Sequence, residues 1–405
     1  MNEKPGGPRL EKFAIVVFLL IIIGTGAAAY LLGEHRTKEK WITVYGENGE
    51  DFALSVTAAH DEGYIIAGET RSFGAGVARD AFLAKIDALG SVLWLKISGG
   101  SASESGHSVA KTSDGGYVVA GWTSSFGSGS DDVYLVKTNS AGENLWAKSH
   151  GGSGTDWGES VALAENGGYM VAGRTTSFGA GSNDFYLIKT DSAGENLWSK
   201  TYGGTADEWA FSLNATSDGG YIIGGHTSSY GAGRDDFYLV KVDASGGVLW
   251  ENTYGGENND RCFSVVQTSD GGYIATGYTS SFGAGSEDVY LVKTDNSGAV
   301  TWTKTYGSTY FDRGYSVSQT DDGGYVIAGY LSPRGTGTRD AYLIRTNSSG
   351  EAIWVKTFGG AGLDRFYSVT QTSDGGFIAA GGTFSSGAGQ SDIYLVKADS
   401  SGLAA

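Results

Sequence analysis

Seven tryptophans recur through this chain at an almost constant spacing, and this repetition constrains the fold more than any other feature. The spacing is 53 residues once and then 52 residues five times, for Trp41, Trp94, Trp146, Trp198, Trp250, Trp302 and Trp354. Units repeated at a fixed period stack on their neighbours and share one continuous core. The sequence therefore predicts a single repeat domain over residues 41–405, although 405 residues would otherwise suggest two or three domains.

Each repeat contains four short strand-like runs, which we name A, B, C and D. In the fifth copy they cover residues 263–268, 273–279, 288–294 and 300–306. Between A and B, an Asp-Gly pair such as Asp270-Gly271 supplies the positive φ angles that a tight hairpin needs. Strand B carries consecutive apolar residues, for example Tyr221-Ile222-Ile223, which is typical of a sheet covered on both faces.

Seven four-stranded antiparallel units with both faces buried indicate an all-β fold, a seven-bladed β-propeller. The series begins with a D strand at residues 41–45 that has no A, B and C before it, and the last copy ends without a D strand. We therefore expect the N-terminal strand to pair with the last blade and close the ring. Closure would remove the open edge that an unclosed array exposes.

The first 40 residues differ from the repeats. Residues 1–12 form a short polar tail, and residues 13–32 carry no charge over the length of one helical bilayer crossing. We interpret 13–32 as a transmembrane helix or signal anchor followed by a polar tether at 33–40; the alternative is a signal peptide cleaved after Ala27-Ala28-Ala29. The expected location is the cell membrane, single-pass, with the propeller extracellular, or secreted after cleavage.

Charge and cysteine content exclude several functions. The formal net charge of −17 gives a surface that repels nucleic acid phosphates. Cys262 is the only cysteine, which excludes an internal disulfide and a thiolate metal cluster and favours a small buried residue. The five histidines occupy different registers of the repeat, so no metal triad is expected and no cofactor is predicted.

One stretch of the third copy, YLIKTDSAGENLWSKTYGG, is followed by Asp-x-x-x-Ser-Val, Gly-Gly-Tyr and Ala-Gly-x-Thr patterns that recur along the chain. Over residues 41–405 this pattern resembles the seven-bladed β-propeller repeats (SBBP-type) of bacterial and archaeal secreted or surface proteins. The Asp-x-x-Gly-x-x-x-Trp portion is more weakly similar to quinoprotein-like propeller repeats, whose dehydrogenases use eight blades and a vicinal cysteine pair that this chain lacks. The resemblance implies the propeller fold and no particular chemistry.

Residues present in every blade are expected to serve folding, because a site for one ligand must break the symmetry of the ring. Two acidic columns are of this kind, and we expect their carboxylates to accept backbone N–H bonds that hold the long loops. The alternative is calcium, bound by adjacent pairs such as Asp131 and Asp132, Asp235 and Asp236, or Glu287 and Asp288. The columns are Asp80, Asp132, Asp184, Asp236, Asp288, Asp340 and Asp392, at the start of strand C, and Asp51, Glu104, Asp156, Glu208, Asp260, Asp312 and Asp364, before strand A.

Two columns that differ from blade to blade are predicted to share one face of the ring, at the D-to-A and B-to-C connections. Aromatic and Arg side chains around a concave mouth are typical of sugar, peptide or protein binding. In the structural alternative, the aromatics cover the seams between blades and the arginines pair with loop carboxylates. The predicted ligand-binding residues are Trp122, Trp157, Arg174, Trp209, His226, Arg261, Tyr278, Arg313, Tyr330 and Arg365.

The leading hypothesis is a non-enzymatic, membrane-tethered extracellular propeller that binds a glycan, a peptide or a partner protein on this face. No catalytic residue is assigned. One alternative is an exported polysaccharide hydrolase, for which Glu159 and Asp207 are the candidate carboxylates. The other is a purely structural module of the cell envelope.

Overall fold

The computed structural model describes residues 40–74, 78–332 and 338–404. The predicted tail, the predicted transmembrane segment and most of the tether lie outside these residues and stay predictions. In the described part, the only helical turn is the 3-10 helix η1 (Glu165–Gly167). No helix there is long and apolar enough to cross a membrane.

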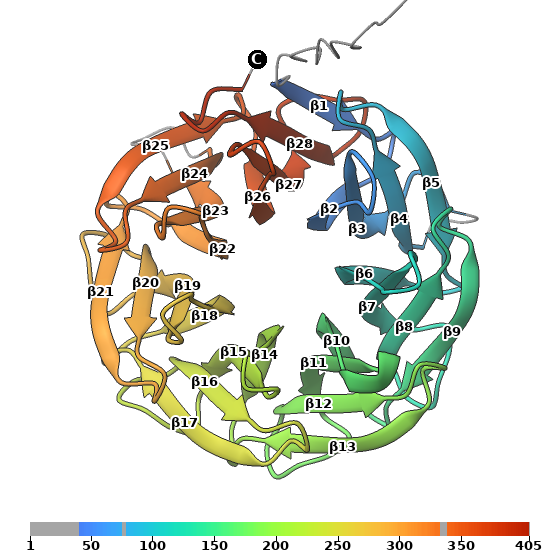
Figure 1. Cartoon of the computed structure of the whole chain (residues 1–405), viewed down its shortest axis with the longest axis horizontal. Coiled ribbons are helices and arrows are strands. Elements are labelled where there is room, and N and C mark those ends of the chain that lie inside the picture. Colours follow the sequence, from blue (N-terminus) through green and yellow to red (C-terminus); the bar gives the residue numbers. More distant parts are fainter. Residues whose placement is uncertain (1–39, 75–77, 333–337, 405) are drawn as a thin grey trace, which may run out of the picture. The chain divides into compact units, whose positions relative to one another are not determined.

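Seven four-stranded antiparallel sheets surround a central axis, which confirms the all-β seven-bladed propeller (Figure 1). In each blade the strands run outward from the axis in the order A, B, C, D. The first three blades are β2 (Asp51–Ala58), β3 (Tyr64–Thr70), β4 (Asp80–Ile86) and β5 (Val92–Ser98); β6 (Glu104–Lys111), β7 (Tyr117–Thr123), β8 (Asp132–Thr138) and β9 (Asn144–His150); β10 (Asp156–Leu163), β11 (Tyr169–Thr175), β12 (Asp184–Thr190) and β13 (Asn196–Tyr202).

The remaining blades follow the same plan. The fourth, fifth and sixth are β14 (Glu208–Ala215), β15 (Tyr221–Thr227), β16 (Asp236–Val242) and β17 (Val248–Tyr254); β18 (Asp260–Gln267), β19 (Tyr273–Thr279), β20 (Asp288–Thr294) and β21 (Val300–Tyr306); β22 (Arg313–Gln319), β23 (Tyr325–Leu331), β24 (Asp340–Thr346) and β25 (Ala352–Phe358). The seventh blade contains β26 (Asp364–Gln371), β27 (Phe377–Thr383), β28 (Asp392–Ala398) and β1 (Trp41–Tyr45).

The outer strand of the seventh blade comes from the other end of the chain. β1 pairs antiparallel with β28, from Trp41 opposite Lys397 to Tyr45 opposite Ile393. The Trp41 ring also meets Tyr64 of the first blade edge-on, with ring centroids 6.2 Å apart. β1 therefore belongs to the last blade by its backbone and touches the first blade by its tryptophan.

The core lies in the gaps between neighbouring blades. All seven residues of β7 and all seven of β8 are buried, which confirms that both faces of the blade are covered. Leu187 of the third blade and Ile223 of the fourth belong to one buried cluster. Cys262 is fully buried in the next gap, as predicted, and burial raises the pKa of its thiol.

A ring of seven hydrogen bonds joins the innermost strands. In each blade the serine hydroxyl of a Ser-Val or Ser-Leu pair in strand A accepts a backbone N–H from the next blade; Val161 N, for example, donates to Ser108 Oγ at 3.2 Å. The series includes the junction of the first and last blades, where Val56 N donates to Ser368 Oγ at 3.1 Å. Innermost strands have no further strand to pair with, so these bonds satisfy N–H groups on an otherwise free edge. The other five join Val109 to Ser55, Leu213 to Ser160, Val265 to Ser212, Val317 to Ser264 and Val369 to Ser316.

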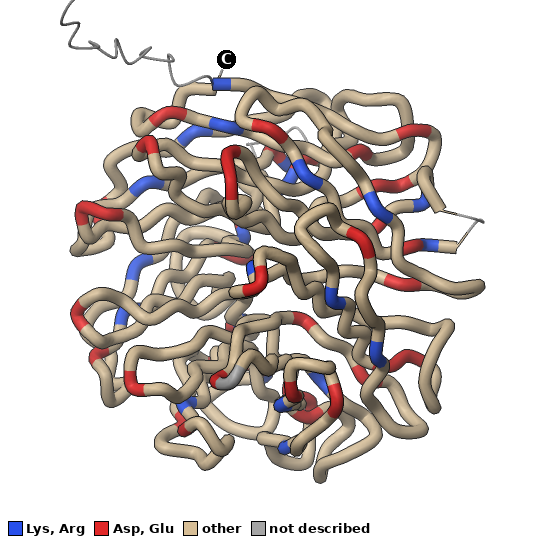
Figure 2. The backbone as a smooth tube through the Cα atoms, turned by 45° about the vertical axis from the view of Figure 1, so that its right-hand side comes forward, with Lys and Arg blue, Asp and Glu red and all other residues tan. Residues whose placement is uncertain are grey.

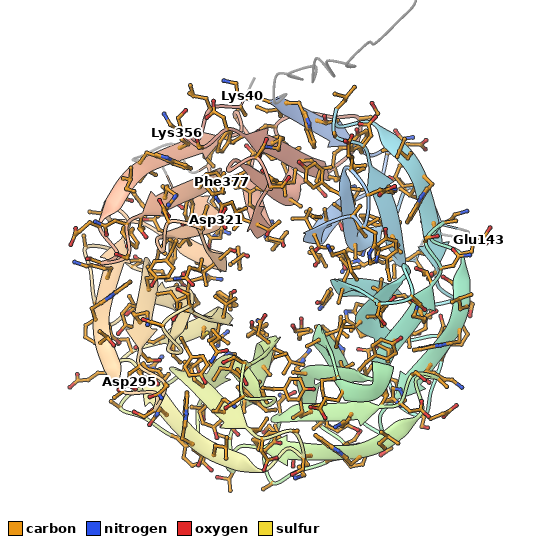
Figure 3. The ribbon with its side chains drawn as sticks, in the orientation of Figure 1. Lys40, Glu143, Asp295, Asp321, Lys356 and Phe377 are labelled. Carbon is orange, nitrogen blue, oxygen red and sulfur yellow. The ribbon has the colours of Figure 1, made fainter. Side chains whose placement is uncertain are left out.

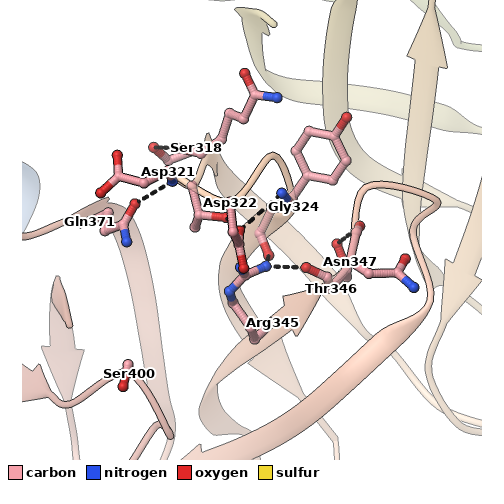
Figure 4. Close-up of polar contacts among 12 residues, drawn as sticks. Ser318, Asp321, Asp322, Gly324, Arg345, Thr346, Asn347, Gln371 and Ser400 are labelled. Atoms are coloured by element: carbon pink, nitrogen blue, oxygen red, sulfur yellow. Dashed lines mark hydrogen bonds and ion pairs between the residues drawn. The ribbon is translucent and has the colours of Figure 1, made fainter. Parts of the chain in front are cut away.

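In six blades, the A-to-B turn is tied to a buried basic side chain of strand C. Lys241 Nζ lies 2.9 Å from Asp218 Oδ2, and the Lys241 side chain is only 3% exposed. Figure 4 shows the sixth blade, where Arg345 replaces the lysine and pairs with Asp322. The third blade has Asn166 in place of the aspartate, and its Lys189 instead donates to the Ala244 carbonyl at 3.2 Å.

Asp218→Asn is expected to lower the free energy of unfolding by about 1 kcal/mol at pH 7, because Lys241 stays buried without a carboxylate while the exposed position of Asp218 lets water screen part of the loss. Burial opposes the charged form of Asp218, but the Thr216 hydroxyl and Lys241 outweigh it and lower its pKa to about 2. The stabilisation is therefore present above the unfolded-state pKa of about 3.9 and lost as the pH falls through about 2. Chemical denaturation at pH 7, 4 and 2 should show that the difference in the free energy of unfolding between parent and variant decreases at the lowest pH.

The matched control is Glu195→Gln, which breaks the exposed pair between Lys148 and Glu195. Exposed pairs contribute little, so this change should cost under about 0.5 kcal/mol. If the loss of stability caused by Asp218→Asn stayed constant down to pH 2, the ion pair with Lys241 would not be its cause.

Strand A starts earlier than the sequence predicted. In the fifth copy β18 covers Asp260–Gln267 rather than residues 263–268, whereas strands B, C and D have their predicted bounds. The added residues pair with the end of β19, where Asp260 lies opposite Thr279. The prediction was wrong here because it placed the loop carboxylate outside the sheet.

Candidate functional site

A β-bulge interrupts strand A in every blade. In β10, Gly158 lies opposite Gly173 and Ser160 lies opposite Ala172, so Glu159 is an extra residue without a partner in β11. Bulges bend a strand and redirect a side chain. The extra residues of the seven blades are Leu54, His107, Glu159, Phe211, Phe263, Tyr315 and Tyr367.

A glycine in strand B makes room for each bulge. A Cβ added at Gly173 would lie 1.8 Å from the backbone oxygen of Trp157, which is far inside contact distance. The recurring Ala-Gly pair of strand B thus marks a close approach of two backbones, which a residue without a side chain permits. The equivalent glycines are Gly68, Gly121, Gly225, Gly277, Gly329 and Gly381.

A cavity of about 350 Å³ lies on the axis of the ring. All seven bulge residues line it, so every blade contributes one side chain; Figure 3 shows side chains of the innermost strands projecting toward the axis. Its other lining residues are Glu69, Arg79, Trp122 and Trp157. The backbone positions are equivalent and the side chains are not, so the cavity has no seven-fold symmetry.

One side of the cavity carries two ion pairs, which we call the polar wall. His107 Nδ1 lies 2.5 Å from Glu159 Oε2, and Arg79 Nη1 lies 3.0 Å from Glu69 Oε1. Burial opposes the charged form of His107, but the Glu159 carboxylate outweighs it and raises the histidine pKa. Each carboxylate of the polar wall therefore has a basic side chain as its partner.

The other side is formed by the bulge residues of the fourth to seventh blades, which we call the aromatic wall. The Phe211 and Phe263 ring centroids are 5.1 Å apart, those of Phe263 and Tyr315 5.0 Å, and those of Tyr315 and Tyr367 5.2 Å. Each ring is partly exposed. Four blades thus present one continuous apolar surface to the cavity.

The two columns predicted for binding lie opposite each other in strands A and B, and several of their members stack at the seams. Trp157, for example, is the ladder partner of Arg174. The rings of Trp122 and Trp157 are stacked, with centroids 5.2 Å apart and an interplanar angle of 14°. The guanidinium of Arg174 lies 3.9 Å from the ring centroids of both Trp157 and Trp209. Trp157 is therefore packed between Trp122 and Arg174, and only the part of its side chain that these two residues leave uncovered lines the cavity.

The predicted arginines of the later blades lie against acids or rings. Arg261 Nε donates to Asp235 Oδ2 at 2.7 Å, and Arg313 Nη2 donates to Glu287 Oε1 at 2.7 Å. The guanidinium of Arg365 lies 5.7 Å from the Tyr367 ring centroid, at one end of the aromatic wall. Pairing of these arginines with loop carboxylates is what the structural alternative predicted for this column.

Three further predicted residues are buried in strand B. Tyr278 lies under the Arg313 guanidinium, 4.4 Å from ring centroid to cation, and Tyr330 is fully buried. Burial, with the nearby Arg261, lowers the pKa of His226 to about 3, so its imidazole is neutral at pH 7. The lining of the cavity includes Trp122 and Trp157 and none of the other eight predicted residues.

The loop carboxylates hold the loops, as predicted. Asp156 Oδ2 accepts the Gly152 backbone N–H at 2.7 Å and the Ser177 hydroxyl at 2.6 Å. In the pairs considered for calcium, Asp131 Oδ2 accepts the Trp157 indole N–H at 3.0 Å, and Asp235 and Glu287 bind arginines. Among the described residues, no three His, Cys, Asp or Glu side chains are grouped as metal ligands.

The two candidate carboxylates of a hydrolase have separate partners. Glu159 lies in the polar wall against His107, whereas Asp207 Oδ1 accepts the Asn183 amide at 2.7 Å and does not line the cavity. The carboxylates in the lining are Glu69 and Glu159. Each of these two is held in an ion pair of the polar wall.

Sequence reasoning missed the bulge residues as a group. The available signal was the column three residues past the loop carboxylate, which reads Leu, His, Glu, Phe, Phe, Tyr, Tyr around the ring. This column differs between blades, as a ligand site must. It was overlooked although it lies next to the two columns that were predicted to bind the ligand.

Comparisons with known proteins agree with the fold. Residues 112–143 match a domain of unknown function (DUF5122) beta-propeller. Regulatory protein FlaEY of Caulobacter vibrioides is 28% identical over 173 residues, which covers 40% of this chain and 16% of that protein. This chain therefore spans only a small part of the length of that relative.

Among solved structures, the Pan2 WD40 domain of Neurospora crassa has a TM-score of 0.50 at 10% identity, covering 87% of this chain and 97% of that one. Sqt1 of Chaetomium thermophilum has a TM-score of 0.49 at 11% identity, covering 84% and 83%. The resemblance to SBBP-type repeats stays a prediction.

Proposed function

We propose that this chain is a non-enzymatic binding module, held at the membrane by residues 13–32, with its propeller outside the cell. The axial cavity carries the proposal, because seven equivalent backbone positions there bear seven side chains that are not equivalent. Positions that serve folding are the same in every blade, as the strand B glycines are. The ligand class is a glycan, a peptide or a partner protein, and the cavity is of the size that ligand sites have.

The alternatives have less support. A glycoside hydrolase needs two carboxylates free to act as acid and as base or nucleophile. Glu69 and Glu159 are each paired with a basic side chain instead. A purely structural module would not need an axial cavity whose lining differs from blade to blade.

Binding is tested by probing glycan and peptide arrays with the full chain and with Tyr315→Ala. We expect a ligand that the parent retains and the variant loses, because Tyr315 lies in the middle of the aromatic wall. Phe178→Ala is the matched control, since Phe178 is an exposed aromatic outside the cavity lining. Equal binding by parent and Tyr315→Ala would contradict a site in the cavity.

The tether and the closure of the ring belong to the same proposal. We expect the full chain to sediment with membranes and to be released only by detergent, and a deletion of residues 13–32 to abolish this. Protease added to intact cells should digest the propeller. In the sequence the tether leads directly into β1, whose pairing with β28 would keep the ring closed.

A further inference from the structure

The two walls of the axial cavity differ in chemistry, and the difference indicates a class of ligand. The aromatic wall offers four partly exposed rings, with neighbouring centroids 5.0 to 5.2 Å apart. Aromatic rings bind apolar C–H surface without hydrogen-bonding it. A ligand that fits this wall therefore has one apolar face.

The polar wall offers hydrogen-bonding groups arranged as two acid–base pairs. Arg79 neutralises Glu69, and His107 neutralises Glu159 when its imidazole is protonated. Carboxylate oxygens accept hydrogen bonds from hydroxyl groups, and a guanidinium donates hydrogen bonds to hydroxyl oxygens. The polar wall is thus suited to several hydroxyls, and with His107 protonated it has no uncompensated charge that would select an ion.

Charges around the cavity disfavour ionic ligands of either sign. A cation on the aromatic wall would approach Arg365, whose guanidinium lies 5.7 Å from the Tyr367 ring centroid. An anion on the polar wall would have to compete with Glu69 for Arg79 and with Glu159 for His107. Figure 2 shows the acidic residues distributed over the described backbone, with Lys and Arg residues among them.

We propose that the axial cavity binds an uncharged sugar ring, with the C–H face of a pyranose against Phe263 and Tyr315 and its hydroxyls toward Glu69, Arg79 and Glu159. A pyranose has one apolar face and a rim of neutral hydroxyls, which matches the two walls. The inference rests on the proposed function and narrows its ligand to a neutral saccharide.

The test uses the full chain in a detergent without a sugar headgroup. An array of neutral glycans, the same glycans carrying uronic or sialic acid, and peptides is probed, and a neutral hit is then titrated by calorimetry alongside tetramethylammonium chloride. We expect a neutral glycan to bind. Phe263→Ala should weaken it about tenfold or more, and Glu159→Gln, which keeps the side-chain volume, should do the same.

Phe282→Ala is the control, because Phe282 is an exposed aromatic that does not line the cavity, and it should bind like the parent. Selection of acidic glycans, of peptides or of tetramethylammonium would overturn the sugar assignment and leave a binding module in place. Undiminished binding of the neutral glycan by the correctly folded Glu159→Gln chain would also overturn it. Absence of any ligand on all probes would overturn this assignment and would limit the proposed function to the binding of a partner protein.

Discussion

Removal of β1, residues 41–45, is expected to lower the free energy of unfolding of the ring by about 5 kcal/mol or more. The deletion removes the whole β1–β28 ladder and the buried Trp41 ring, and burial of one tryptophan alone contributes up to about 5 kcal/mol. It also leaves β28 as an unpaired edge. The measurement is thermal and chemical unfolding, with hydrogen exchange of the β28 amides as a local probe.

Ile42→Ala is the control within the same strand, since Ile42 is 43% exposed and its loss should change stability little. A peptide spanning residues 40–46, added to the deleted chain, should restore protection of β28 by adding a strand to its free edge. An unchanged midpoint after the deletion would refute the role of β1 in holding the ring closed.

Gly225→Ala is expected to destabilise the fourth blade by about 3 kcal/mol or more. A Cβ at this position would lie 1.9 Å from the Trp209 backbone oxygen and 2.7 Å from the Phe185 ring, so strand A must move. Such overpacking costs about 1–3 kcal/mol even where side chains can adjust, and here the obstacle is backbone. The shift would also displace the Phe211 bulge, so binding in the cavity should weaken together with stability.

Gly224→Ala is the matched control, one residue earlier in the same strand. Its Cβ would meet side-chain atoms of Val265 and Cys262, and most other blades carry alanine at this position. We expect a cost under about 1.5 kcal/mol. Equal melting temperatures for the two variants would show that the strand B glycine is not required by the bulge.

The architecture was predictable because the repeat itself encodes it. The seven tryptophans indicated the blade number, and Asp-Gly turns with consecutive apolar residues indicated strands B, C and D. The start of strand A was not predictable from these patterns. Asp260 is polar and follows a loop, and only its pairing with Thr279 of another strand makes it part of the sheet.

The candidate site was less accessible to sequence reasoning. A regular strand alternates its side chains between two faces, and an extra residue breaks that count. Glu159 faces the axis because it is the extra residue of a bulge, and this bulge requires a glycine, Gly173, in the neighbouring strand. The stacking of Arg174 between two tryptophans likewise depends on side chains from neighbouring blades, so the sequence left binding and seam packing as alternatives.

The bulges have a consequence for how such rings diversify. The hydrogen-bonded serines and the strand B glycines maintain the framework, whereas the seven bulge residues have no ladder partner of their own. Because they lack a ladder partner, we expect these seven residues to be exchanged with less effect on assembly than the serines and glycines of the framework, so that single substitutions can change the ligand preference. Rings that share this framework are therefore expected to differ in what they bind, and inheritance of the fold is a poor guide to inheritance of the ligand.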